Sequence, residues 1–198
     1  MSRLLGALRA TETPERELVG RAQAGDLAAF EELVGVHADR LYTVVLRLVG
    51  DRGEAEDIVQ ETLLRAWRGI GRFQARAMIF TWLYRIAVNE SNRALERRLR
   101  GGTIVPVDEE AVQVPAPAHE RPANRAEQHE LRDALEFAIA NLAPPYRTAL
   151  VLRDVEGLST REAAEIAGVG EAAFKSRLHQ ARLKVRASLG DAALVSAT

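Results

Sequence analysis

Residues 159–186 read STREAAEIAGVGEAAFKSRLHQARLKVR, and this stretch decides how the second half of the chain folds. Ser159, followed three residues later by Glu162, forms a capping box and predicts that a helix begins here. The turn Gly168-Val169-Gly170 ends this short helix, and a longer helix follows from about Glu171. The face of the longer helix that we expect to be buried carries Phe174, Leu178, Ala181 and Val185. Two helices joined by a short turn containing glycine constitute a helix-turn-helix.

The opposite face of the longer helix is basic. At spacings of 4, 3 and 4 it carries Lys175, His179, Arg182 and Arg186. In a DNA-binding helix-turn-helix, the N-terminal part of the second helix enters the major groove. We therefore expect base contacts from the residues near its start, which are Glu171, Lys175, Ser176 and His179. We expect phosphate contacts from Arg177, Arg182 and Arg186.

Upstream of this stretch, the chain divides into two helical segments joined by a linker. The linker, residues 101–124, holds four of the seven prolines and the acidic run 108–110, and proline disfavours helix. Apart from residues 103–107, no segment alternates between apolar and polar residues as a strand does. We predict an all-α protein of two small domains on a flexible linker. The predicted boundaries are an N-terminal tail at 1–14, helical domains at 15–100 and 125–190, the linker at 101–124 and a C-terminal tail at 191–198.

One helix of the first domain, residues 54–71, has two distinct faces. The face predicted to lie in the core carries Val59, Leu63, Ala66, Trp67 and Ile70. The other face carries Asp57, Glu61, Leu64 and Arg68. A charged face with one leucine is typical of a solvated surface, and it also suits docking of a partner helix. The residues alone leave both interpretations open.

The next predicted helix, residues 79–98, carries an unusual combination of side chains. We expect its inward face to carry Leu83, Ile86, Ala87 and Ala94. Another face, at spacings of 3, 4 and 4, carries Trp82, Arg85, Asn89 and Arg93. Bases stack on an aromatic ring, guanidinium groups hold phosphates and an amide reads a base edge, so this face could bind single-stranded DNA. The alternative is that Trp82 only packs against a neighbouring helix.

Charge and composition set further limits. The formal net charge is −1, yet the charges are unevenly distributed. Residues 51–100 carry ten arginines and seven acidic residues, whereas residues 101–130 carry two arginines and six acidic residues. Separate basic segments can bind a polyanion, although solvated helix faces also explain them. The chain has no cysteine, and its four histidines show no metal-ligand spacing. We therefore expect that the protein binds no metal and no cofactor and that it is not an enzyme. The N-terminus lacks the apolar core of a signal peptide, which predicts a cytoplasmic protein.

Two separate motifs resemble one protein family. AEDIVQETLLRAWRGIGRF (55–73) and FTWLYRIAVN (80–89) are similar to the second conserved region of extracytoplasmic-function (ECF) sigma factors, group 4 of the sigma-70 family. LAPPYRTALVLRDVEGLSTREAAEIAGVGEAAFKSRLHQAR (142–182) is similar to their fourth region. The resemblance covers most of residues 15–189, and the short linker leaves no room for the third region of larger sigma factors. It implies a factor that directs RNA polymerase to promoters, opens the DNA and initiates transcription.

The resemblance also implies partners and site residues. Core RNA polymerase would be bound at the clamp helices of its largest subunit, with further contact to the flap of the second-largest subunit. The clamp helices would meet Asp57, Gln60, Glu61, Leu64 and Arg68. The minus-ten element of the promoter would meet Gln74, Arg76, Trp82, Arg85, Asn89 and Arg93. Residues 175–186 would bind the minus-thirty-five element, and an anti-sigma factor would inhibit the protein.

One departure from the family pattern concerns the start of the last helix. Where the family usually has a threonine-valine pair before Lys-Ser-Arg, this chain has Ala173-Phe174, preceded by Ala172. A hydroxyl able to bind phosphate is therefore missing, which affects the expected affinity for the upstream element. The alternative function is a stand-alone helix-turn-helix regulator whose first domain senses a ligand or oligomerises. Binding of promoter duplex in the absence of core polymerase would distinguish the two.

Overall fold

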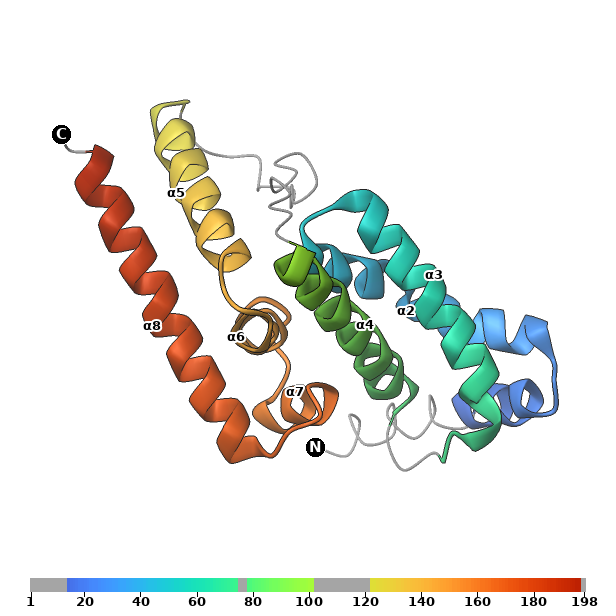
Figure 1. The fold of residues 1–198 in the computed structure, drawn as a ribbon. Coiled ribbons are helices and arrows are strands. Elements are labelled where there is room, and N and C mark those ends of the chain that lie inside the picture. Colours follow the sequence, from blue (N-terminus) through green and yellow to red (C-terminus); the bar gives the residue numbers. More distant parts are fainter. Residues whose placement is uncertain (1–13, 75–77, 102–121, 197–198) are drawn as a thin grey trace, which may run out of the picture.

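The computed structural model describes residues 14–74, 78–101 and 122–196, and within these ranges the chain is helical with no strand (Figure 1). The first domain comprises a helix over residues 14–23, α2 (Leu27–Val49), α3 (Arg52–Gly69), the 3-10 turn η1 (Ile70–Arg72) and α4 (Ile79–Gly101). The second comprises α5 (Pro122–Ala140), α6 (Pro144–Leu150), the π-helical turn η2 (Val151–Val155), α7 (Thr160–Ile166) and α8 (Glu171–Ser196). The prediction of an all-α, two-domain protein is confirmed.

Polar side chains define where several helices begin. The Asp26 carboxylate accepts a hydrogen bond from the backbone N–H of Ala29 at the start of α2, and Asp51 caps α3 in the same way. The predicted capping box is present: the Ser159 hydroxyl accepts from the backbone N–H of Glu162, whose carboxylate accepts from that of Ser159. These contacts satisfy backbone donors that a helix leaves free at its start.

The core of the first domain lies between α2, α3 and α4. The fully buried face of α3 is rotated from the predicted stripe, because Ile58 and Thr62 are buried whereas Leu63 and Trp67 are only partly buried. The predicted Ala66 is fully buried. The small side chains on this face let α2 and α4 approach α3 closely, and hydrophobicity alone does not reveal such positions.

The second domain follows its hydrophobic pattern closely. Phe174, Leu178, Ala181 and Val185 are all buried, as predicted. Helix α8 runs through Ser196, into the stretch 191–198 predicted to be a tail, because the alanines and leucine there favour helix. Likewise, α5 begins at Pro122, inside the predicted linker, since proline is tolerated in a first helical turn. The possible strand at 103–107 lies outside the described residues.

The two domains are in contact. Figure 1 shows α6 and α7 lying between α8 and the first domain, and α7 packs along α4 while α6 contacts both α4 and α2. Polar contacts cross this interface from residues far apart in the sequence, including a hydrogen bond from the Thr148 hydroxyl to the Asn92 side-chain oxygen at 3.0 Å. The helix-turn-helix and the Trp82 face of α4 therefore lie on neighbouring parts of one molecule.

Candidate nucleic-acid interface

Trp82 forms a ridge between two surface hollows on α4. It is partly buried, and its ring lies 5.1 Å from that of Phe73, centroid to centroid. Gly69 leaves room for the indole, because a Cβ atom at that position would lie 3.3 Å from the Trp82 ring. The ring therefore packs against the domain while it also borders two hollows, and binding of single-stranded DNA by Trp82 stays a prediction.

The two hollows beside Trp82 are lined by cationic and polar side chains. One, of about 280 Å³, is lined by Arg72, Phe73, Gln74, Thr81, Trp82, Arg85 and Glu165. The other, of about 420 Å³, is lined by Arg65, Gly69, Arg72, Trp82, Ile86, Asn89, Glu90 and Arg93. An aromatic ring with guanidinium groups on both sides suits a strand whose bases stack while its phosphates are held nearby. We call these two hollows and their ridge the Trp82 surface.

The structure brings together five of the six residues predicted to meet the minus-ten element: Gln74, Trp82, Arg85, Asn89 and Arg93. Arg76 lies outside the described residues. Sequence reasoning missed Arg65 and Arg72, because they come from α3 and from η1 and reach the surface only through packing.

One carboxylate organises the arginines of the larger hollow. The Glu90 carboxylate, whose side chain is 13% exposed, pairs with Arg65 at 3.0 Å and with Arg93 at 2.8 Å. Arg65 also pairs with Glu61 at 2.6 Å, and the hydrogen bond that Arg65 donates to Glu61 is the main cause of the raised pKa of Arg65. These pairs orient the guanidinium groups while leaving their outer edges in solvent, which suits phosphate binding.

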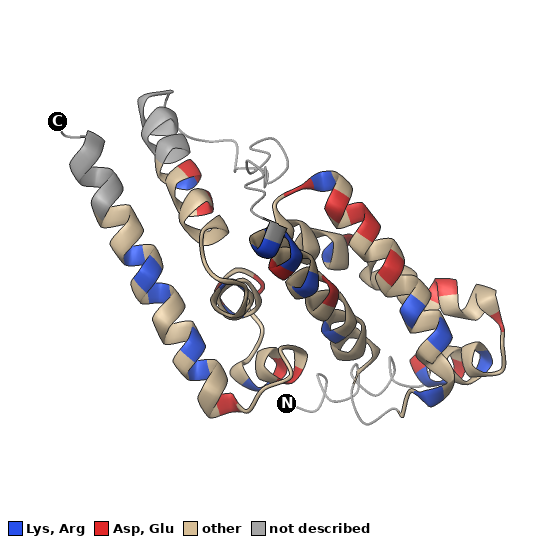
Figure 2. Ribbon diagram, in the orientation of Figure 1, with Lys and Arg blue, Asp and Glu red and all other residues tan. Residues whose placement is uncertain are grey.

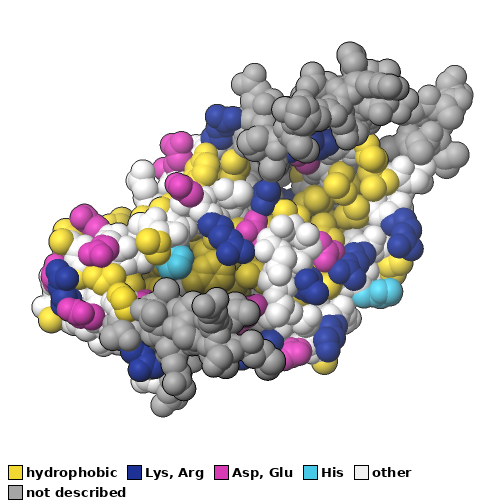
Figure 3. Space-filling view, turned by 180° about the vertical axis from the view of Figure 1, so that it is seen from behind, with side chains coloured by type: hydrophobic (Ala, Val, Ile, Leu, Met, Phe, Trp, Pro, Cys, Tyr) yellow, Lys and Arg dark blue, Asp and Glu magenta, His cyan; other side chains and the backbone are white. Residues whose placement is uncertain are grey.

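The basic face of α8 is exposed along its length. Of the predicted DNA contacts, Arg177 is partly buried and the rest are exposed, namely Glu171, Lys175, Ser176, His179, Arg182 and Arg186. Basic residues recur along α8 in Figure 2, and in the view from behind (Figure 3) basic side chains gather on the side of the molecule where α8 lies. The helix therefore presents the row of cations that its spacing predicts.

The start of α8 explains the departure from the family pattern. Phe174 is fully buried, whereas Ala172 and Ala173 are exposed. The phenylalanine thus takes a core position, and the two alanines leave the first turn of the helix without a side-chain hydroxyl. The groups left at this end of the helix are the side chains of Glu171 and Lys175 and the free backbone N–H groups of the first turn.

The surface predicted to bind polymerase is accessible. Asp57, Gln60 and Arg68 are exposed, Glu61 is partly exposed and Leu64 is 51% exposed although it is apolar. Figure 2 shows acidic residues gathered in the N-terminal half of α3 and basic residues further along it. An exposed leucine within a mixed-charge face is compatible with docking of a partner helix.

Known proteins match this arrangement in both domains. The family model Sigma-70 region 2 matches residues 33–101, and the model Sigma-70, region 4 matches residues 132–185. The RNA polymerase sigma-H factor of Pseudomonas aeruginosa is 32% identical over 177 residues, which cover 87% of this chain and 92% of that protein. The ECF RNA polymerase sigma factor SigW of Bacillus subtilis is 30% identical over 89% of this chain and 97% of that protein.

The chain belongs to the ECF group of the sigma-70 family. Its region 2 spans most of α2 through α4 and contains the Trp82 surface, whereas its region 4 contains the helix-turn-helix. Two solved structures have a similar fold. CnrH, solved with the cytosolic domain of CnrY, superposes with a TM-score of 0.62 at 26% identity, covering 90% of this chain and 98% of that one. The sigma factor RpoE of Bartonella quintana, solved with the anti-sigma factor NepR, superposes with a TM-score of 0.57 at 25% identity. The match covers 81% of this chain and 96% of that one.

Two further features of the described residues concern metal ions and membranes. No three His, Asp or Glu side chains in that part of the chain lie together in a way that could hold a metal ion. None of its helices is long and apolar enough to cross a membrane.

Proposed function

We propose that this chain binds core RNA polymerase, directs it to a specific set of promoters and supports melting of the promoter DNA. Two observations support this function together. The Trp82 surface offers stacking and phosphate contacts to a single strand, and α8 offers an exposed cationic face to a duplex. A protein that must recognise both melted and double-stranded DNA needs both surfaces in one chain.

The division of contacts follows from the geometry of each surface. Trp82, Arg85, Asn89, Arg93 and Gln74 would meet the minus-ten element, where unpaired bases can stack on the indole. The first two turns of α8 would enter the major groove at the minus-thirty-five element. The exposed face of α3 around Leu64 would dock on the clamp helices of polymerase, and the second domain would also contact the polymerase flap.

The proposed role requires no catalytic group in the chain, because polymerase itself forms the phosphodiester bonds. We infer that the chain is not an enzyme and needs no cofactor. A factor that works on polymerase and promoter DNA acts in the cytoplasm, at the nucleoid.

An anti-sigma factor is the regulatory partner that we propose. RpoE of Bartonella quintana, which has the same fold as this chain, was solved in complex with an anti-sigma factor. An inhibitor of this chain would act by covering the α3 face or the Trp82 surface. Affinity purification from the native host tests this proposal, with recovery of a stoichiometric protein that blocks core binding as the expected result.

In vitro transcription tests the main function. Purified chain and core polymerase are incubated with a library of promoter-sized duplexes, and the transcripts are sequenced. We expect initiation from a subset that shares two elements, and none from core polymerase alone. Tight, specific binding of the free chain to duplex, without any effect on core polymerase, would instead identify a stand-alone helix-turn-helix regulator.

A further inference from the structure

Glu156 lies at the centre of the interface between the two domains. It follows η2 in the second domain, and its carboxylate pairs with two arginines of α2, at 2.5 Å from Arg47 and 3.2 Å from Arg40. Arg40 also donates to the backbone oxygen of Glu156 at 3.2 Å. Only 6% of the Glu156 side chain is exposed, so the pairing is shielded from water although Arg40 itself is half exposed. A shielded carboxylate between two cations is costly to separate from them.

The arginine partner on the first domain is itself held in place. The Arg40 guanidinium lies 5.1 Å from the centre of the Phe80 ring, an arrangement in which cation and ring attract each other. Phe80 in turn packs on the fully buried Tyr84, with ring centroids 4.1 Å apart. Arg40 is therefore held by a contact within the first domain as well as by Glu156, and such a contact lowers the entropy cost of forming the ion pair.

Arg147 makes a second contact between the domains. It is buried in α6, and its guanidinium donates at 2.6 Å to the backbone oxygen of Leu48 near the C-terminus of α2. The same group donates to the oxygens of Ala140 and Leu142 in its own domain. Burial lowers the pKa of Arg147 to about 10, so the side chain is still cationic at neutral pH. A cation at the C-terminal end of a helix is favoured by the helix dipole.

These contacts place α7 beside one of the two hollows of the Trp82 surface. α7 packs along α4, and its exposed residue Glu165 lines the same hollow as Trp82 and Arg85. A carboxylate in this position repels the phosphates that the arginines would otherwise attract. The second domain thus restricts one of the two DNA-binding surfaces.

The arrangement also conflicts with the span of a promoter. Elements named minus-ten and minus-thirty-five lie about 25 base pairs apart, which corresponds to ~85 Å of B-DNA. A compact chain of 198 residues is only about 40 Å across. The two surfaces cannot occupy both elements until the domains separate.

We infer that Glu156, held by Arg40 and Arg47, is a latch that keeps the sigma factor closed and inactive until it is released. This inference rests on the proposed function, because it treats the Trp82 surface as a site for DNA. The latch also explains how a free sigma factor would avoid occupying DNA without polymerase. Binding of core polymerase to the exposed α3 face would compete with closure by favouring the open form.

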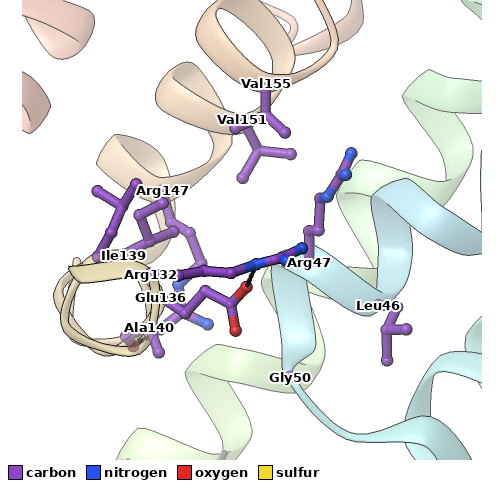
Figure 4. A pocket seen from close by; sticks show the side chains of 11 residues that line it. Leu46, Arg47, Gly50, Arg132, Glu136, Ile139, Ala140, Arg147, Val151 and Val155 are labelled. Atoms are coloured by element: carbon purple, nitrogen blue, oxygen red, sulfur yellow. Dashed lines mark hydrogen bonds and ion pairs between the residues drawn. The ribbon is translucent and has the colours of Figure 1, made fainter. Parts of the chain in front are cut away.

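The interface around the latch is incompletely packed, so it can be separated. Figure 4 shows a hollow of about 190 Å³ between α2, α5 and α6–η2, with Arg47 and Arg147 on opposite sides of it. Buried apolar residues of the two domains form one cluster, and beside this hollow the contact between the domains is made by polar interactions. Weakening one of them should shift the balance between closed and open molecules.

The test compares Glu156→Gln with Glu96→Gln. Both variants lose one carboxylate, but Glu96 pairs with Arg100 within α4 and takes no part in the interface. Trp67→Phe is introduced throughout, so that Trp82, the other of the two tryptophans, is the only fluorescent indole. Quenching of Trp82 by acrylamide reports its exposure, and small-angle X-ray scattering reports the radius of gyration. Binding of a labelled single-stranded DNA of mixed sequence is measured without core polymerase.

We expect Glu156→Gln to lower the ratio of closed to open molecules by roughly a hundredfold or more, because removing one partner of a shielded charge pair is strongly destabilising. Trp82 quenching, the radius of gyration and the affinity for single-stranded DNA should all rise, and Glu96→Gln should change none of them. Unchanged quenching and unchanged radius in Glu156→Gln would overturn the latch. Opening without a gain in DNA affinity would support the latch and overturn the assignment of DNA binding to the Trp82 surface.

A charge exchange keeps the test decisive if a single variant folds poorly. Glu156→Arg and Arg47→Glu should each open the protein, because each places like charges together at the interface. Combining them restores opposite charges, so the double variant should return toward the closed values of radius and quenching. If the changes in radius and quenching of the two single variants simply add in the double variant, the two residues do not act as a pair. That result would contradict the latch.

Discussion

The guanidinium of Arg182 on α8 is held by the carboxylate of Asp154 in η2 through two hydrogen bonds, at 2.8 and 2.6 Å. These bonds are the main cause of the raised pKa of Arg182. Asp154 and Glu156 stand two residues apart and reach in different directions, one to the recognition helix and the other to the first domain. The π-helical turn therefore connects α8 with the interface between the domains.

This pairing separates Arg182 from Arg186, although their spacing predicts phosphate contacts from both. Arg186→Ala should reduce the slope of log affinity against log salt by about one unit on upstream duplex DNA. Arg182→Ala should reduce it by less, because a guanidinium already paired with a carboxylate displaces fewer counterions. Asp154→Asn should free Arg182 and steepen the slope. Equal losses from both alanine variants would show that the ion pair breaks when DNA binds.

Lys175 should contribute to sequence specificity rather than to general affinity. It is exposed in the second turn of α8, the part of a recognition helix that reaches base edges. If it contacts guanine, Lys175→Ala should cost about 1–3 kcal/mol on the preferred site and little on variants of that base pair. Affinities for single-base variants of the upstream element measure this. A uniform loss would make Lys175 a phosphate contact and leave specificity to Glu171, Ser176 and His179.

Leu64 tests the polymerase-binding surface. The residue is 51% exposed and lies away from the core of the first domain, so Leu64→Asp should leave the melting temperature almost unchanged. The same change should abolish binding to core polymerase, because it places a charge where an apolar contact is expected. Asp substitution at Val36, which is also exposed but lies on α2, serves as the control. Wild-type affinity for core in Leu64→Asp would remove this surface from the docking site.

Trp82 tests single-strand binding. Trp82→Ala should weaken binding of single-stranded minus-ten DNA by about 1–3 kcal/mol per stacked base. Trp82→Phe should keep much of that affinity, since a smaller ring still stacks. Because the ring also packs beside Gly69 and Phe73, urea denaturation must accompany the binding measurement. If Trp82→Ala is less stable to urea but, where folded, binds single-stranded DNA as tightly as the wild type, the role of Trp82 is purely structural.

Ser159 and Glu162 predict a pH-dependent contribution to stability. Hydrogen bonds from the Ser159 hydroxyl and backbone lower the pKa of Glu162. This stability is present above the ordinary pKa of glutamate and disappears as the pH falls through the lowered value. Ser159→Ala should cost about 1 kcal/mol at neutral pH, and less below about pH 4. Ser159→Thr, which keeps the cap, should resemble the wild type. A cost independent of pH would show that Glu162 gains nothing from Ser159.

The sequence predicts well those features that depend on local spacing. The buried face of α8 and the capping box at Ser159 follow from residues within a few turns of one another, and both are confirmed. The candidate DNA-binding residues of α4 share one face for the same reason, on which Arg85, Asn89 and Arg93 are exposed and Trp82 is partly buried. Helical geometry fixes which side chains share a face, whatever the rest of the chain does.

Other features arise only when distant segments pack. Arg65 and Arg72 join the Trp82 surface from other elements, and Asp154 pairs with Arg182, a residue that spacing assigns to DNA. Glu156 and Arg47 are 109 residues apart, so no local pattern could reveal their contact. The sequence by itself therefore determined the all-α class, the buried face of α8 and the family to which the chain is similar, whereas the buried face of α3 was predicted only in part. The tertiary structure decided which charges are paired and which surface is covered, because ion pairs between distant residues form only where packing brings them together and excludes water.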